Sequence, residues 1–127
     1  MLNFKAVLRY NPQDPEAPNK HYAFPVYRSK VGLKEISDEV ADKSSLTRGD
    51  CYNVIQNFMS VMLKALRNGD IVKLDDLGTF RVTLSSEGAE TPQDLSSVAI
   101  KRARIRFQPG EELKGMLANL KFAKKEG

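Results

Sequence analysis

Residues 46–82 read LTRGDCYNVIQNFMSVMLKALRNGDIVKLDDLGTFRV, and this stretch decides the fold of the 127-residue chain. Its first part repeats apolar residues at helical spacing, which predicts an amphipathic helix. The apolar stripe consists of Cys51, Val54, Ile55, Phe58, Met62, Ala65 and Leu66. Thr47, with Asp50 three residues later, resembles a capping box, and Asn68-Gly69 suits a left-handed helix end. We therefore expect one helix between these two signals.

The second part of the stretch changes to the two-residue period of β-strands. IVKL (71–74) and TFRVTL (79–84) predict two strands joined by the turn DDLG. Residues 85–97 carry no apolar pattern beyond Leu95, so we expect them to leave the body of the domain as an excursion. VAIKRARIRF (98–107) predicts the returning strand. Together these segments predict a three-stranded antiparallel sheet with a protruding β ribbon.

The ribbon has a basic root and an acidic tip. In the returning strand, apolar residues alternate with the bases Lys101, Arg102, Arg104 and Arg106. Ile100 breaks the alternation, which predicts a bulge or a twist near Lys101. The excursion instead carries Glu87, Glu90 and Asp94. A polyanion would be attracted at the root and repelled at the tip, although a charged strand face is also what a solvated sheet surface requires.

Further helices are predicted on both sides of this core. Residues 33–43 have helical apolar spacing and predict a short helix that forms a hairpin with the next one. Residues 111–120, EELKGMLANL, predict a last helix, and we expect the basic tail 121–127 to fray. We expect Phe58, Phe80 and Phe107 to lie in the core rather than on bases. The predicted fold class is α+β.

The first thirty residues have a different character. Residues 2–10 alternate as a half-buried strand, and NPQDPEAPNK (11–20), with three prolines, is a loop. HYAFPVYRSK (21–30) is a second extended stretch, which Pro25 restricts to an edge strand or a broken one. We predict an N-terminal β extension, 1–30, and a main domain, 31–127.

Composition narrows the function class. Lys+Arg 20 against Asp+Glu 16 gives a net charge of +4, which is compatible with nucleic acid but does not require it. One Cys, the absence of a signal-peptide h-region and the absence of a membrane-length apolar run predict a cytoplasmic protein with no membrane partner. The sequence has no phosphate-binding Gly-rich loop, metal-ligand quartet or Ser or Cys beside a His. It therefore predicts no catalysis, no cofactor and no metal.

The element order and the residues GTFRV (78–82) and FQPGEELK (107–114) resemble the HU/IHF family of bacterial histone-like DNA-bending proteins. The N-terminal extension resembles an HU-related branch known chiefly from Bacteroidetes-type bacteria. The resemblance implies an intertwined homodimer with a helical base, whose two β ribbons reach around the minor groove of DNA. It also implies a place at the nucleoid.

The resemblance implies roles for particular residues. Lys114 matches a phosphate-contacting lysine of the family, and from the charge pattern we expect the root of the ribbon to carry the other DNA contacts, which are Arg81, Lys101, Arg102, Arg104 and Arg106. Pro92 stands near the intercalating proline of the family, yet its surroundings also suit a plain turn. The arm departs from the family where it has Ser85, Gly88 and Thr91 in place of bases, and Glu111 replaces a frequent lysine.

Two functions follow. The first is largely sequence-nonspecific DNA binding and bending through the root of the ribbon. The alternative is a structural or protein-interaction module that kept the fold and lost most DNA contacts because its arm is acidic. RNA and a protein partner remain open, because attraction to phosphate does not distinguish the two nucleic acids.

Overall fold

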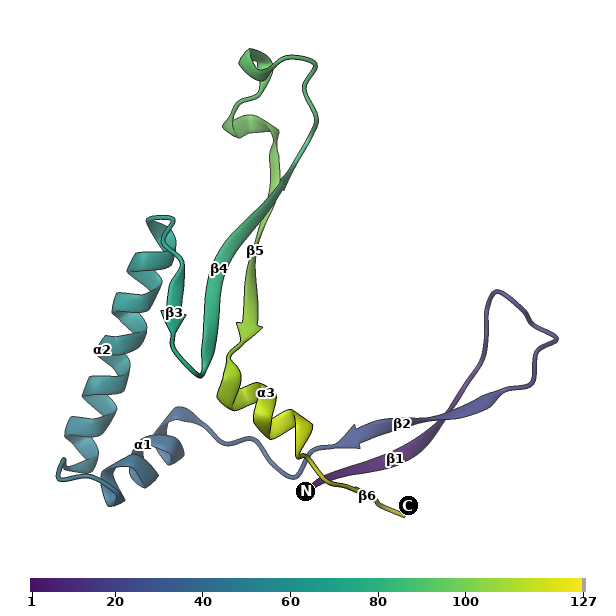
Figure 1. Cartoon of the computed structure of the whole chain (residues 1–127), viewed down its shortest axis with the longest axis horizontal. Coiled ribbons are helices and arrows are strands. Elements are labelled where there is room, and N and C mark those ends of the chain that lie inside the picture. The colour runs from purple at the N-terminus through teal and green to yellow at the C-terminus, as the bar shows by residue number, and fades with distance from the viewer. Residues whose placement is uncertain (127) are drawn as a thin grey trace. The chain divides into compact units, whose positions relative to one another are not determined.

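The computed structural model describes residues 1–126 and divides into two compact units (Figure 1). Unit 1 comprises Met1–Gly32 together with the C-terminal residues from Met116 on, and unit 2 comprises Leu33–Gly115. The predicted division into domains 1–30 and 31–127 stays a prediction, and its last residue, Gly127, lies outside the described residues.

Unit 2 begins with the expected helical hairpin. Helix α1 spans Leu33–Asp42 and helix α2 spans Arg48–Arg67. The Thr47 hydroxyl oxygen accepts a hydrogen bond from the Asp50 amide at 3.1 Å, which confirms half of the predicted capping box. Within residues 1–126, the reciprocal bond from the Thr47 amide to the Asp50 carboxylate is not formed.

Helix α2 ends where Asn68-Gly69 predicts. Gly69 has φ +87, a left-handed conformation that glycine adopts without a Cβ penalty. The Gly69 amide donates to the Leu66 carbonyl at 3.0 Å, and the Asp70 amide donates to the Ala65 carbonyl at 3.0 Å. This pair of bonds is a Schellman motif, so the last carbonyls of the helix have partners.

The sheet of unit 2 is antiparallel with strand order β3-β4-β5. Strand β3 is Val72–Leu74, β4 is Gly78–Ser86 and β5 is Ile100–Pro109. Strands β4 and β5 continue beyond β3 as a two-stranded ribbon (Figure 1). Its tip contains two 3₁₀ turns, Pro92–Asp94 and Ser97–Ala99. The predicted sheet with a protruding ribbon is confirmed.

The predicted bulge is also confirmed. Ser85 pairs with Arg102, but Ser86 pairs with Ile100. Lys101 is therefore the extra residue on β5, and it lies where the apolar alternation of the sequence breaks. A bulge of this kind lets a strand change its twist without losing the pairing on either side.

Tight packing anchors the root of the ribbon. The Phe80 and Phe107 rings are directly opposite in the register, with centroids 4.7 Å apart and planes tilted by 43°. Gly78 has φ +152, and a Cβ at this position would overlap the Phe107 ring. The chain reaches β4 through a turn in which Asp75 takes φ 43 and the Leu77 amide donates to the Leu74 carbonyl.

Unit 1 is a three-stranded sheet with strand order β2-β1-β6. Strand β1, Leu2–Arg9, pairs antiparallel with β2, Lys20–Val26, and the two strands form a wide hairpin in the predicted N-terminal β extension. Strand β2, with Pro25, is an edge strand. Strand β6, Phe122–Lys124, pairs parallel with β1, so the expectation of a frayed tail is wrong. A three-residue strand has no visible period, and the edge of β1 supplies its partners.

Helix α3, Glu111–Ala118, follows β5 as expected. The buried side chains among residues 1–126 are few: Ser37, Ala41, Cys51 and Leu66. Phe58 is 48% exposed and Phe107 is 40% exposed, so their expected place in the core is wrong for the single chain. Both lie on the predicted apolar faces, which one chain alone leaves uncovered.

Candidate nucleic-acid interface

The register of β4 and β5 brings four arginines to one face of the ribbon. Residues that pair directly across two strands point to the same side of the sheet. Arg81 pairs with Arg106, and residues two apart along each strand share that side. The face therefore carries Arg81, Arg102, Arg104 and Arg106, four of the six predicted DNA contacts.

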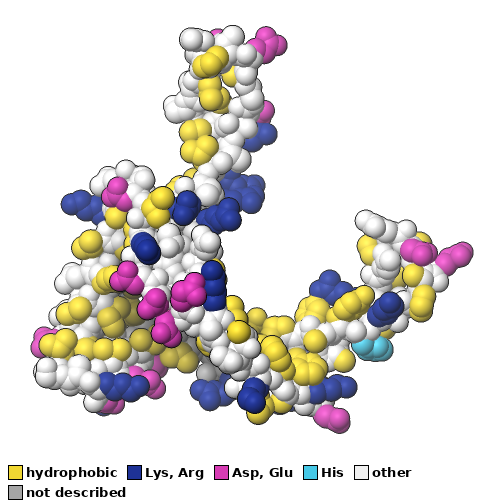
Figure 2. Space-filling view, viewed as in Figure 1, with side chains coloured by type: hydrophobic (Ala, Val, Ile, Leu, Met, Phe, Trp, Pro, Cys, Tyr) yellow, Lys and Arg dark blue, Asp and Glu magenta, His cyan; other side chains and the backbone are white. Residues whose placement is uncertain are grey.

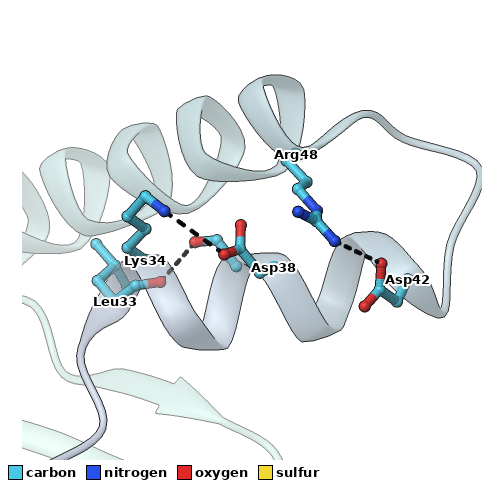
Figure 3. A network of polar contacts seen from close by, with 6 residues as sticks. Leu33, Lys34, Asp38, Asp42 and Arg48 are labelled. Carbon is cyan, nitrogen blue, oxygen red and sulfur yellow. Dashed lines mark hydrogen bonds and ion pairs between the residues drawn. The ribbon is translucent and has the colours of Figure 1, made fainter.

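These arginines have no acidic partners, whereas two basic side chains of the helical hairpin do. Figure 3 shows Lys34 beside Asp38 at 3.7 Å, and Arg48 beside Asp42 at 3.5 Å. Within residues 1–126, none of the four ribbon arginines forms an ion pair. The ribbon therefore presents a row of four unpaired positive charges on one face.

The arrangement costs the folded chain energy unless an anion is present. Arg81 and Arg106 are directly opposite one another, and like charges in such pairs destabilise a sheet. Arginines at alternate residues of one strand also lie about 7 Å apart. A row of phosphates would relieve the repulsion, because each guanidinium can donate two hydrogen bonds to one phosphate.

Two hydroxyl residues share this face, and neither was predicted from the sequence as a DNA contact. Thr83 pairs with Arg104, and Ser85 pairs with Arg102. Hydroxyl groups donate to phosphate oxygens in many protein–DNA interfaces. The signal was available, because both residues alternate with the apolar residues of TFRVTLSS.

The tip of the ribbon is acidic. Figure 2 shows Lys and Arg side chains along the ribbon and Asp and Glu side chains near its far end. Lys101 is not free, because its ammonium group lies 3.1 Å from the Glu87 carboxylate. Pro92 opens the first 3₁₀ turn, and the Thr91 hydroxyl oxygen caps that turn by accepting from the Asp94 amide at 3.3 Å. Its role as a wedge stays a prediction.

Lys114 stands apart from the arginine face, on helix α3. Its ammonium group lies 4.0 Å from the Glu111 carboxylate, one turn earlier in the helix. Both side chains are exposed, so the pair contributes little and a phosphate could replace the carboxylate. The structure thus brings together four of the predicted contacts, leaves Lys101 paired at the bulge and holds Lys114 on another element.

Within residues 1–126, no three His, Cys, Asp or Glu side chains gather as a metal ion would require. In that part of the chain, no helix combines the length and apolar character needed to cross a membrane.

Comparison with known proteins agrees with this geometry. Residues 1–124 match the HU-HIG family, described as an HU domain fused to wHTH, Ig, or Glycine-rich motif. Integration host factor subunit alpha of Vibrio campbellii (strain ATCC BAA-1116) is 30% identical over 91 residues, which cover 68% of this chain and 91% of that protein. DNA-binding protein HU 1 of Bacillus subtilis (strain 168) is 30% identical over 86 residues, covering 66% and 94%.

Two solved structures are similar in fold. A crystal structure from Bacteroides vulgatus ATCC 8482 has a TM-score of 0.67 at 14% identity and covers 97% of this chain. This chain spans 47%, about half, of that protein's length. Anabaena HU, crystallised with DNA, has a TM-score of 0.56 at 20% identity over 71% of this chain and 100% of its own. The predicted HU-like α+β fold is confirmed.

The match to the family covers both units, whereas the integration host factor and HU relatives account for about two thirds of the chain. The element order and the motifs around GTFRV and FQPGEELK thus gave the right resemblance. The chain belongs to the HU-HIG family, within the wider HU/IHF group of proteins.

Proposed function

We propose that this protein binds double-stranded DNA through the arginine face of the β4–β5 ribbon, as a non-catalytic architectural protein of the cytoplasmic nucleoid. The observation that carries the proposal is the row of four arginines without acidic partners, two of them directly opposed. Family membership supports it, since a relative is named DNA-binding protein HU 1 and an HU of the same fold was crystallised with DNA.

The proposed contacts are mainly to phosphates. Guanidinium and hydroxyl groups on one face suit the DNA backbone, whose phosphates attract basic side chains whatever the DNA sequence. A two-stranded ribbon that follows the minor groove can bend the duplex when an apolar residue enters a base step. Pro92 is the proposed wedge, and a plain turn residue is the competing interpretation. Energy transfer between dyes at the two ends of a duplex would measure the bend with and without Pro92→Ala.

The proposed active form is a homodimer. Val54, Phe58 and Val61 lie at helical spacing on α2 and are 57%, 48% and 66% exposed in the single chain. Covering the exposed part of one such side chain stabilises an assembly by roughly 1 kcal/mol, so a second copy with the same three residues exposed is a suitable partner. Val61→Glu should therefore yield a monomer in analytical ultracentrifugation, while Ser60→Glu on another side of α2 should remain dimeric. A wild-type chain that sediments as a monomer at every concentration would contradict the dimer.

Salt-dependent binding tests the DNA proposal. The fluorescence anisotropy of a labelled duplex would measure the association constant K at several salt concentrations. We expect log K to fall linearly with log salt concentration, with a slope of about 0.9 for each phosphate engaged. Neutralising Arg102, Arg104 and Arg106 to Gln should lower this slope by about three units for each protomer of the dimer that engages the duplex. A control with Lys34, Lys43 and Arg48 changed to Gln removes the same charge from the helical hairpin and should keep most of the slope.

The outcomes separate the two functions. Equal losses in the two variants would show a response to net charge alone and would overturn the assignment to the ribbon. A folded dimer that binds no duplex would favour the protein-interaction module, which the acidic tip also suits. An RNA duplex in the same titration distinguishes the nucleic acids, because its wide, shallow minor groove presents a different surface to the ribbon.

A further inference from the structure

Unit 1 carries a second basic surface, on the β1–β2 hairpin, which the ribbon does not include. The register places the odd-numbered residues of β1 on one face with their partners on β2. The facing pairs are Arg9 with Lys20, Val7 with Tyr22, and Lys5 with Phe24. This face therefore mixes positive charge with aromatic rings.

A hollow of about 630 Å³ opens beside the end of the hairpin on this face. Its walls include Arg9, Tyr10, Lys20, Tyr22 and Phe24. The Arg9 guanidinium carbon lies 4.6 Å from the centre of the Phe24 ring, a cation–π contact that fixes the charge at the wall. Tyr10 and Tyr22 are 59% and 51% exposed, so their rings are open to a ligand. The volume is in the range of ligand pockets, about 300–1,000 Å³.

The charge of the hollow is not compensated. Arg9 and Lys20 are directly opposed, and like charges in such a pair destabilise the hairpin. Within residues 1–126, neither side chain has an acidic partner, and no described acidic residue lines the hollow. Asp14 lies in the loop between β1 and β2, and its carboxylate accepts a hydrogen bond from the Glu16 amide at 3.3 Å.

These features point to one class of ligand. An anion alone would need only Arg9 and Lys20, and an apolar ligand would not need them. Exposed tyrosine rings beside unpaired Arg and Lys side chains suit a ligand in which flat rings and negative charges recur along a chain. An unpaired nucleic-acid strand has this chemistry. A duplex keeps its base faces stacked, so it could not use the rings.

We propose that this hollow in unit 1 binds unpaired nucleotides of DNA, with bases stacked on Tyr22 and Tyr10 and phosphates at Arg9 and Lys20. The site is separate from the proposed duplex contact on the β4–β5 ribbon. It gives the protein a means to hold a single strand, such as one exposed at a gap, a fork or a melted step.

The test compares a labelled oligothymidine with an abasic oligomer of the same length and charge. The full chain should bind the oligothymidine more tightly, because only that strand has bases to stack. Changing Arg9 and Tyr22 to Thr, a good strand residue, should weaken oligothymidine binding by about tenfold and remove its advantage over the abasic strand. The control changes His21 and Lys124 to Thr, which removes a ring and a positive charge from the other face of the same sheet.

Each outcome decides the proposal. Full oligothymidine binding by the Arg9/Tyr22 variant, or equal losses in both variants with unchanged circular dichroism, would overturn it. A polyglutamate peptide that competes as well as oligothymidine would replace it with an acidic protein partner. Duplex binding without oligothymidine binding would sink this site and leave the ribbon proposal intact, while the reverse would sink the ribbon proposal alone.

Discussion

The β1–β2 hairpin of unit 1 and the β4–β5 ribbon of unit 2 both hold like charges opposite one another. Arg9 faces Lys20 in the first, and Arg81 faces Arg106 in the second. Both also place acidic residues in the segment that joins their strands. They differ in the residues beside these Arg and Lys side chains, which are aromatic in the hairpin and carry hydroxyl groups in the ribbon.

That difference separates two kinds of recognition. Arginine beside Thr83 and Ser85 can donate hydrogen bonds to phosphates but has no ring on which a base can stack. Arginine and lysine beside Tyr22 can do both. Two hairpins with the same distribution of charge can therefore address different features of a nucleic acid, and charge alone would not have shown this.

The two hairpins are also anchored differently, and the largest effect is expected where the ribbon is anchored. Gly78→Ala would place a methyl group against the Phe107 ring and force alanine into φ +152, which side chains rarely adopt. Strain and overpacking together should destabilise unit 2 by about 3 kcal/mol. At a fixed protein concentration this should lower Tm by more than about 10 °C in thermal denaturation followed by circular dichroism.

Gly88→Ala is the matched control at the other end of the ribbon. A Cβ at Gly88 meets nothing within 4 Å, so this variant should melt with the wild type. Equal melting of the two variants would mean that the contact between Gly78 and Phe107 does not anchor the ribbon.

The sequence predicted the parts of the fold that depend on local periodicity. The helix ends at Thr47 and Gly69, the three strands of unit 2 and the bulge at Lys101 all leave a pattern within a few residues. Strand β6 leaves none, because three residues show no period and its pairing joins segments more than a hundred positions apart in the sequence. The exposure of Phe58 was missed for a related reason, since an apolar stripe does not say which chain covers it.

Strand β6 anchors the hairpin through backbone hydrogen bonds, where the ribbon is anchored by side-chain packing at its root. The Leu2 amide donates to the Lys121 carbonyl at 2.9 Å, and the Lys125 amide donates to the Phe4 carbonyl at 2.7 Å. Ala123→Pro would remove the amide in the middle of this strand and should destabilise unit 1 by about 1–3 kcal/mol. Amide hydrogen exchange should then quicken in β1 and stay unchanged in β4 and β5.

Ala123→Val is the control, because valine keeps the amide and suits a strand. Its exchange in β1 should equal that of the wild type. Unchanged exchange in the proline variant would show that the hairpin holds together without β6, and faster exchange in β4 and β5 as well would show that the two units unfold as one.

The candidate site was predicted less completely than the fold. Alternation along the strands gave the four arginines and could have given the two hydroxyls, but only the register shows that Arg81 is opposite Arg106 and that the hydroxyls are opposite Arg104 and Arg102. The pairing of Lys101 with Glu87 depends on where the excursion returns, which the sequence of residues 85–97 does not show. Arg9 and Tyr22 were seen as strand residues, and only the register sets them on one face.

The smallest expected effect is on duplex affinity, when an acidic residue is neutralised at the tip of each hairpin. Glu87→Gln would release Lys101 from its 3.1 Å contact, so that the ammonium group could meet a phosphate. Duplex affinity should rise, and the salt slope should increase by about one unit for each protomer that engages the duplex. Stability should hardly change, because the two side chains are 58% and 67% exposed and an ion pair in water contributes little.

Asp14→Asn makes the same change of charge at the loop of the β1–β2 hairpin, and it should leave duplex binding and its salt slope unaltered. A gain in duplex affinity for the ribbon variant alone would mean that Glu87 acts locally, by pairing with Lys101, which would otherwise contact DNA. Equal gains in both variants would mean that DNA responds to the net charge of the whole chain. In that case the acidic tip would weaken DNA binding through its charge alone and not through the contact between Glu87 and Lys101.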